Sequence, residues 1–194
     1  MSMSGPATER PRDIASFAVD LVVALGARAA FSLTGGMAMY LNRAVGTHPG
    51  LSAVYNQHEQ ACANAADGYA KASDFQAPGL AVVTAGPGVT NTITSLCSAF
   101  GDSSPVVVLA GQIKTPDIDR LGTRTYGIQE VRSQAIVSPC VKRFTRLSQA
   151  GFGFFPISVL SIWNMARMTR LSFSAYREGE RLRERGCMLG GRGT

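Results

Sequence analysis

Apolar residues recur along the chain with two different spacings. From Ile14 to Leu25 they return every three or four positions, which is the period of a helix with one buried face. Asp13 stands at the N-cap position of this helix and Gly26 at its end. Elsewhere the apolar residues form short runs bounded by Gly, Pro or polar residues, which is typical of strands, at 29–33, 51–55, 79–84 and 106–110.

Helical segments are predicted between these strands. They cover 37–45, 59–72, a stretch from Pro87 or Thr90 to about residue 100, and 133–137, with a last strand at 141–145. The runs at 79–84 and 106–110 lack alternation, so both of their faces are expected to be buried. Strands that alternate with helices predict an α/β fold with a parallel sheet covered by helices on both faces.

One carboxylate lies at the expected ligand edge of this sheet. In such folds ligands bind outside the carboxyl ends of the strands. Glu59 follows the strand at 51–55 and opens a helix of very small residues, EQACANAADGYAK, which lets another backbone approach closely and exclude water. A plain structural explanation is also open, because a glutamate at a helix N-terminus is favoured by the helix dipole.

The segment TAGPGVTN, residues 84–91, predicts a strand, a tight turn and a helix. Two chemical roles are open besides the turn itself. The turn could bind a phosphate at the helix N-terminus, although the lysine of a P-loop is missing. Alternatively, Gly86 and Gly88 leave backbone uncovered, which suits the close approach of a flat ring.

Composition and charge describe a globular protein and argue against a nucleic-acid partner. The net charge is +6, but residues 1–147 contribute 12 basic and 10 acidic side chains, and the excess lies in an Arg-rich C-terminal segment. The four cysteines form no C-x-x-C pair, and no metal site is expected. No apolar run reaches the roughly 20 residues of a membrane span, so we expect a cytoplasmic protein with no membrane contact.

The alternating pattern stops after Leu147. We therefore expect two parts: residues 1–147 as the folded domain, incomplete at its C-terminal end, and residues 148–194 as a divergent basic tail. No further strand–helix unit is predicted in the tail, which is interpreted as disordered or as the product of a frameshift.

Four motifs occur together in a specific order: TGG at 34–36, HEQACANAADGYAK at 58–71, TAGPGVTN at 84–91 and SSPVVVLAGQ at 103–112. In this order and spacing they resemble the N-terminal, pyrimidine-binding domain of thiamine-diphosphate-dependent enzymes. The nearest family is acetolactate synthase (acetohydroxyacid synthase, large subunit), and GIQEVRSQAIVSPCVKRFTRL at 127–147 continues the likeness. The resemblance covers about residues 12–147.

The resemblance implies a role for each rim residue. Glu59 matches the catalytic glutamate that hydrogen-bonds N1′ of the aminopyrimidine and favours its imino tautomer, which takes the proton from the thiazolium carbon. Gln129 matches a glutamine that faces the substrate region. Two positions depart from the family: Thr34 stands where proline is usual, and Ile128 replaces a phenylalanine. The remaining residues implied to bind the pyrimidine are Gly35, Gly36, Pro87 and Asn91.

The family's diphosphate anchor is absent from the sequence. Its G-D-G motif, which binds the diphosphate through Mg²⁺, does not occur here, and FAD is likewise expected only in the full-length family enzyme. We therefore expect part of an enzyme that decarboxylates and ligates 2-keto acids, inactive alone, in a homo-oligomer or with a complete homologue. The alternatives are a non-catalytic module that pairs with such a homologue, a fragment of another thiamine-diphosphate-dependent decarboxylase, and an unrelated nucleotide-binding protein.

Overall fold

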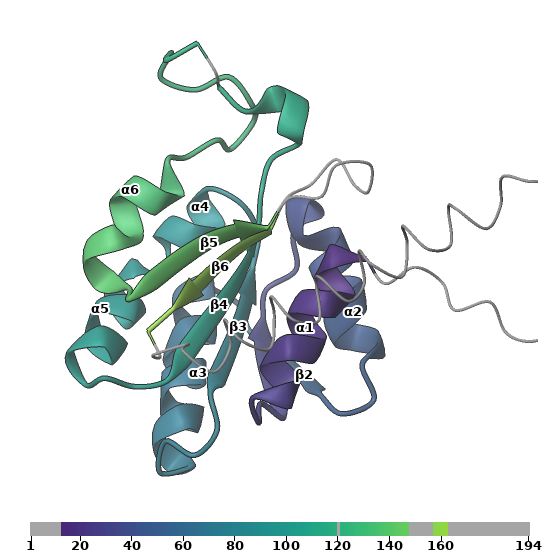
Figure 1. The fold of residues 1–194 in the computed structure, drawn as a ribbon, viewed down its shortest axis with the longest axis vertical. Coiled ribbons are helices and arrows are strands. Elements are labelled where there is room, and N and C mark those ends of the chain that lie inside the picture. The colour runs from purple at the N-terminus through teal and green to yellow at the C-terminus, as the bar shows by residue number, and fades with distance from the viewer. Residues whose placement is uncertain (1–12, 120, 148–156, 163–194) are drawn as a thin grey trace, which may run out of the picture. The chain divides into compact units, whose positions relative to one another are not determined.

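In the part of the chain that the structure describes, six strands form one sheet in the order β2-β1-β3-β4-β6-β5 (Figure 1). The computed structural model describes residues 13–119, 121–147 and 157–162. The first four strands are parallel, as predicted: β1 (Ala29–Ser32), β2 (Ser52–Tyr55), β3 (Gly79–Val83) and β4 (Val106–Gly111). Every residue of β3 and β4 is buried, which confirms that both faces of these central strands are covered.

Helices cover both faces of the sheet, which confirms the predicted α/β class. On one face lie α1 (Ile14–Ala24), the 3₁₀ helix η1 (Gly36–Ala38) and α2 (Met39–Thr47) (Figure 1). On the other face lie α3 (Glu59–Ala72), α4 (Pro87–Thr90), α5 (Ile93–Gly101) and α6 (Ser133–Val137). The core on this second face joins side chains of α3, α5 and α6 to β3, β4 and the last strand.

Local chemistry explains where the first helix starts. The Asp13 carboxylate accepts hydrogen bonds from the backbone N–H groups of Ala15, at 3.0 Å, and Ser16, at 2.9 Å. These bonds satisfy two of the donors that a helix start leaves without partners. The N-cap predicted from the sequence is thereby confirmed.

The small residues of α3 let this helix lie directly on the sheet. A Cβ atom added to Gly79 in β3 would stand 1.8 Å from the carbonyl oxygen of Ala66. Ala63, Ala66 and Ala70 are fully or almost fully buried at this contact face of the helix. Close backbone approach, which the sequence suggested for this helix, is therefore made toward β3.

The last two strands depart from the expected parallel pattern. β5 (Arg143–Leu147) and β6 (Ile157–Ser161) are antiparallel to each other, and β6 is also antiparallel to β4. The connection between β5 and β6, residues 148–156, is shorter than the dozen or more residues that a parallel crossover needs. β6 also lies in the segment where no further strand–helix unit was predicted, and it pairs with the edge of β4.

Two further elements differ in detail. The single helix expected from Pro87 or Thr90 to about residue 100 is two, α4 and α5, separated by Asn91 and Thr92. A long segment, residues 112–132, follows β4 and contains the 3₁₀ helix η2 (Thr115–Asp117), while η3 (Ser138–Cys140) follows α6. In the part of the chain that the structure describes, no helix has the length and apolar character of a membrane span.

Candidate functional site

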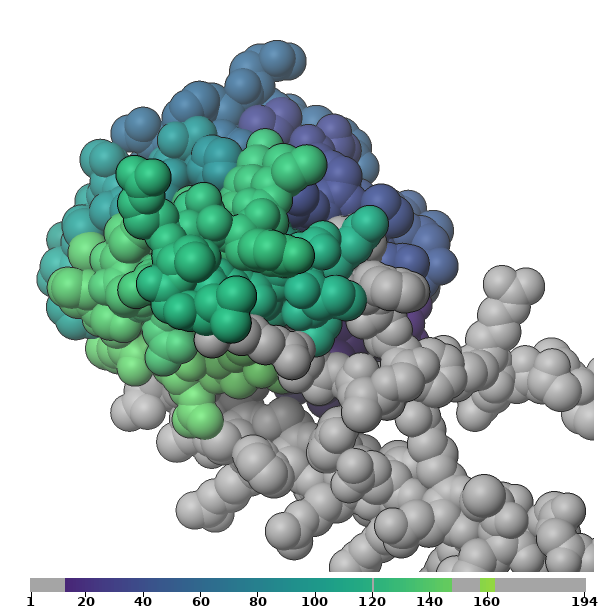
Figure 2. Space-filling model, turned by 90° about the horizontal axis from the view of Figure 1, so that it is seen from above, coloured from purple at the N-terminus to yellow at the C-terminus, as the bar shows by residue number. Residues whose placement is uncertain are grey.

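The carboxyl ends of the parallel strands meet at one edge of the sheet, where most of the predicted site residues lie. Figure 2 looks down on this edge and shows the 112–132 segment, teal to green, spread over its middle. Loops after β1, β2 and β3 carry the TGG, HEQ and AGPG motifs. The topology therefore brings segments from residues 34 to 91 to one rim, as the strand pattern predicted.

Glu59 is held at this rim as the first residue of α3. Its side chain is largely buried, with 9% of the residue exposed. The Asn91 side-chain amide donates a hydrogen bond to Glu59 Oε2 at 2.9 Å. The preceding residue, His58, is the N-cap, and its Nδ1 accepts from the backbone N–H of Gln60 at 3.1 Å. One carboxylate oxygen is thus fixed, while Glu59 Oε1 has no hydrogen-bond partner among the described residues.

Asn91 reaches Glu59 because of the break between α4 and α5. It is the C-cap of the four-residue α4, and its backbone N–H donates to the carbonyl of Pro87 at 2.9 Å. A single continuous helix was predicted here, so the prediction missed this break. Pro87 itself is exposed at the start of α4.

Thr84, at the end of β3, is packed between two glycines. A Cβ atom at Gly35 would stand 2.4 Å from Thr84 Cβ, and one at Gly88 would stand 3.0 Å from Thr84 Cγ2. The Thr84 hydroxyl is buried and has no hydrogen-bond partner in the described structure. In contrast, a Cβ atom at Gly36 would meet nothing within 4 Å, so the rim is open on that side.

The backbone of the 112–132 segment packs directly against Gly86. Its φ of +59° lies in the left-handed region, and an added Cβ atom would stand 2.0 Å from the carbonyl oxygen of Gln129. Gln129 also has a positive φ, +60°, and its side chain is exposed. This contact brings the backbone of Gln129, the predicted substrate-region glutamine, against the turn that also carries Pro87 and Asn91.

The same turn does not form a phosphate cradle. The backbone N–H of Gly88 donates to the carbonyl of Ala85, and the N–H groups of Val89 and Thr90 both donate to the carbonyl of Gly86. These donors are used inside the turn, so they do not face a ligand. The glycine backbones of this turn, which were predicted to be uncovered, are buried instead: Gly86 packs against Gln129 and Gly88 against Thr84.

The carboxylate of the half-buried Glu130 holds the segment that carries Gln129 in place. Glu130 accepts hydrogen bonds from the backbone N–H groups of Asp119, Tyr126 and Gly127, at 2.8, 2.7 and 3.2 Å. Burial acts to raise the pKa of Glu130, but these backbone donors outweigh it and the pKa lies below its usual value. The segment is therefore held best when Glu130 is ionised.

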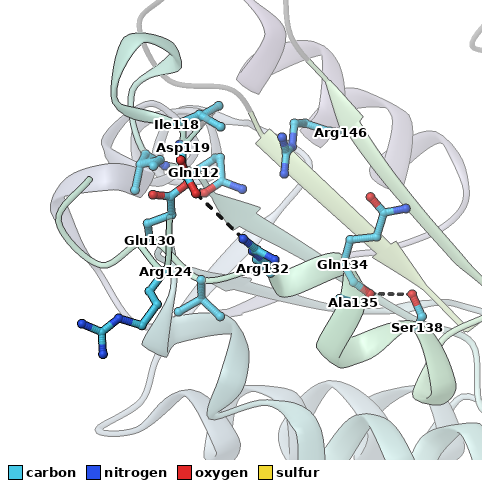
Figure 3. A pocket seen from close by; sticks show the side chains of 12 residues that line it. Gln112, Ile118, Asp119, Arg124, Glu130, Arg132, Gln134, Ala135, Ser138 and Arg146 are labelled. Atoms are coloured by element: carbon cyan, nitrogen blue, oxygen red, sulfur yellow. Dashed lines mark hydrogen bonds and ion pairs between the residues drawn. The ribbon is translucent and has the colours of Figure 1, made fainter. Parts of the chain in front are cut away.

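A separate pocket of about 480 Å³ opens beside this segment and does not include Glu59 (Figure 3). Arg146 reaches it from β5, and Gln134 from α6. Asp119 and Arg132 form an ion pair at 3.8 Å on its wall. Sequence reasoning missed this pocket because its wall joins side chains more than 30 positions apart: Gln112, Ile113, Ile118, Asp119, Arg124, Glu130, Val131, Arg132, Gln134, Ala135, Ser138 and Arg146.

Comparison with known proteins identifies the family to which the chain belongs. Residues 12–136 match the family model of the thiamine pyrophosphate enzymes, N-terminal TPP binding domain. The match covers well over half of the chain, so the chain belongs to this family.

Within the family, the sequence is similar to acetolactate synthase large subunits. It is 39% identical over 101 residues to the isozyme 3 large subunit of Escherichia coli K12, covering 52% of this chain and 17% of that protein. It is 31% identical over 134 residues to the large subunit of Lactococcus lactis, covering 69% and 22%. For the chloroplastic enzyme of Arabidopsis thaliana the identity is 35% over 107 residues, covering 55% and 16%. The chain thus spans about a fifth of the length of these relatives.

The residues at the rim fit the pyrimidine half of thiamine pyrophosphate. An aminopyrimidine ring presents both hydrogen-bond donors and acceptors. The rim holds the Glu59 carboxyl group, which Asn91 binds through Oε2, and a buried Thr84 hydroxyl with no partner in the described structure. The open side at Gly36 leaves room for a flat ring. In the described residues no three His, Cys, Asp or Glu side chains gather as metal ligands.

Proposed function

We propose that this chain supplies the pyrimidine-binding half of a thiamine pyrophosphate site in an acetolactate synthase-like enzyme, with Glu59 as the catalytic residue. The observation that carries the proposal is the largely buried Glu59 carboxyl group, fixed through one oxygen by Asn91 and unpartnered at the other. A carboxyl group held in this way can share a proton with a ring nitrogen of the cofactor.

The other rim residues hold and orient the ring. Gly35 and Gly36 border it after β1, and Pro87 and Asn91 border it after β3. When bound, thiamine pyrophosphate supplies a nucleophilic thiazolium carbon for reaction with a 2-keto acid. Gln129, carried against Gly86, faces the substrate side. Asn91 orients the Glu59 carboxyl group through its hydrogen bond. It therefore acts as a positioning residue in addition to bordering the ring.

The diphosphate half of the site comes from outside these 194 residues. The sequence has no G-D-G motif, so Mg²⁺ and the diphosphate require a second set of ligands, and FAD belongs to the full-length family enzyme. We propose that a complete homologue or a further copy provides this partner, in the cytoplasm. The chain by itself is expected to form no acetolactate from pyruvate with thiamine pyrophosphate and Mg²⁺, and metal-dependent turnover by the purified chain would contradict this.

A chimaera tests the role of Glu59 directly. Residues 12–136 of this chain would replace the matching segment of the Escherichia coli isozyme 3 large subunit, to which the chain is 39% identical over 101 residues. Glu59→Gln in the chimaera is expected to slow hydrogen–deuterium exchange at the thiazolium carbon by about two to four orders of magnitude, the usual contribution of a general acid or base. The amide keeps a hydrogen bond but does not share the proton.

Asp74→Asn is the matched control, because Asp74 is an exposed carboxylate at the far end of α3 and its substitution makes the same chemical change. This variant is expected to exchange at the rate of the parent chimaera. Equal exchange rates for Glu59→Gln and Asp74→Asn would remove Glu59 from the mechanism. A folded parent chimaera without exchange would favour the non-catalytic module instead.

A further inference from the structure

The pocket beside the 112–132 segment contains a buried amide that the fold uses only in part. Gln112 directly follows β4, and 4% of the residue is exposed. Its side-chain oxygen accepts a hydrogen bond from the backbone N–H of Ile113 at 3.0 Å, so the NH₂ group is the end of the amide that remains. This NH₂ group donates to no other residue of the described structure, and Gln112 lines the pocket (Figure 3). Since a buried donor without a partner is costly, the amide marks a place for an acceptor on a ligand.

The two carboxylates that line the pocket already have partners. Asp119 forms an ion pair with Arg132 at 3.8 Å and accepts a hydrogen bond from the backbone N–H of Leu121 at 2.9 Å. Both oxygens of Glu130 accept hydrogen bonds from backbone N–H groups. These carboxylates therefore hold parts of the protein itself in place, and they do not define a site for a cation.

One cation of the pocket has no such partner. Arg146 is exposed on β5, and its guanidinium group forms no hydrogen bond or ion pair with another described residue. In Figure 3 its side chain runs from β5 toward the side of the pocket on which Gln112 lies, whereas Arg124 points away from the other labelled residues. Apolar side chains also line the pocket: Ile113, Ile118, Val131 and Ala135.

We propose that this pocket is a binding site for a small carboxylate with an apolar tail. The Gln112 amide and the Arg146 guanidinium group donate hydrogen bonds to the carboxylate oxygens, and the tail lies against the apolar part of the lining. The volume of about 480 Å³ lies within the range of small-molecule sites. Because the lining does not include Glu59, this site is independent of the proposed thiamine pyrophosphate site.

The charges of the lining favour a carboxylate over a phosphate. A phosphate dianion would face the carboxylates of Asp119 and Glu130, with Arg146 as the cation that the protein does not already pair. A carboxylate carries a single negative charge and two acceptor oxygens, which match one guanidinium group and one amide. The lining therefore distinguishes between the two kinds of anion by charge.

Binding of hexanoate to the full chain tests the proposal. Saturation-transfer difference NMR observes the ligand, so self-association of the chain does not hide binding. Hexanoate is expected to bind with a Kd of about 1 mM, as suits a ligand of this size. Hexanamide has the same tail without the charge, and it is expected to bind about tenfold more weakly or worse. Inorganic phosphate at the same concentration should not displace hexanoate.

Three variants locate the bound probe. Arg146→Gln changes an exposed residue, so it should fold, and it is expected to weaken hexanoate binding about tenfold or more. Arg143→Gln is the matched control, because Arg143 is exposed on the same strand outside the pocket lining, and it should bind hexanoate like the parent. Gln112→Glu keeps an oxygen for the Ile113 N–H but replaces the donor with an acceptor, so it is expected to abolish binding.

Three results would overturn the proposal. The first is no binding of hexanoate at about 10 mM, tenfold above the expected Kd. The second is equal affinity for hexanoate and hexanamide, and the third is equal affinity of Arg146→Gln and Arg143→Gln for hexanoate. Displacement of hexanoate by phosphate would show that the pocket binds anions without selecting a carboxylate, which also contradicts the proposal. None of these results bears on the role of Glu59.

Discussion

Replacing Gly35 by alanine tests how tightly the pyrimidine rim is packed. The backbone of Gly35 is extended, with φ of −158°, so alanine can adopt its conformation without strain. The added methyl carbon would nevertheless stand 2.4 Å from Thr84 Cβ and 2.6 Å from Thr84 Oγ1. The neighbouring Gly36 is the control, because a methyl group there meets nothing within 4 Å.

The expected magnitude follows from the clash. Thr84 Cβ is fixed to the end of β3 and cannot move without its backbone, so overpacking should cost about 1–3 kcal/mol. For a domain of this size each kcal/mol lowers Tm by about 2–4 °C, so Gly35→Ala should lower Tm by roughly 2–12 °C. Gly36→Ala should change the free energy of unfolding by less than about 0.5 kcal/mol.

The assay is urea unfolding of both variants, followed by a double-mutant cycle. Thr84→Gly removes the atoms that the new methyl group would strike, so it should recover about 1 kcal/mol or more of the loss when combined with Gly35→Ala. The close contact between Gly35 and Thr84 would be refuted if Gly35→Ala and Gly36→Ala were equally stable. It would also be refuted if the changes in unfolding free energy caused by Gly35→Ala and Thr84→Gly were simply additive.

Three further predictions concern the helix packing, the 112–132 segment and association. Gly79→Ala should lower the free energy of unfolding by about 3 kcal/mol, because the added methyl group would strike the backbone of α3. Gly68→Ala, on the exposed face of α3, should raise the free energy of unfolding by about 0.5–1 kcal/mol. Equal urea midpoints for the two variants would refute this. The folded pKa of Glu130 is lowered, so its stabilisation holds at neutral pH and fades as pH falls below the unfolded value of about 4.3. Amide protection factors in 112–132, which are corrected for the intrinsic slowing of exchange in acid, should therefore fall at acid pH in the parent but not in Glu130→Gln. The chain should self-associate at low micromolar concentration, because the edge strand β2 exposes Val54 and Tyr55; a monomer by sedimentation would contradict this.

The strongest sequence patterns predicted their elements well. The apolar runs of β3 and β4 and the period of α1 and α3 depend on burial and capping within each segment, and the structure has them within one or two residues. The alternation of strands and helices predicted that the loops after the first strands share one rim, and Glu59 is the first residue of α3, as predicted. The four motifs also identified the family before any geometry was known.

The features that the sequence did not predict depend on partners distant in the chain. β5 begins at Arg143 rather than residue 141 because its bounds are set by pairing with β6, where Arg143 lies opposite Ser161. The bond from Asn91 to Glu59 needs a break between two helices that apolar spacing alone does not reveal. The contact between Gly86 and Gln129 depends on the path of a long loop, which has no period to follow.

The placement of β6 between β4 and β5 has a consequence for synthesis on the ribosome. β4, whose residues are all buried, is complete at Gly111, but its neighbour β6 is made only after residue 156. At about 5–20 residues per second, several seconds pass in which the most apolar strand has one unpaired edge. Chaperone binding to nascent chains stalled before Ile157 should therefore exceed binding to chains stalled well beyond Ser161. Pairing of β6 with β4 is thus the step that protects this edge of the sheet against pairing with other chains.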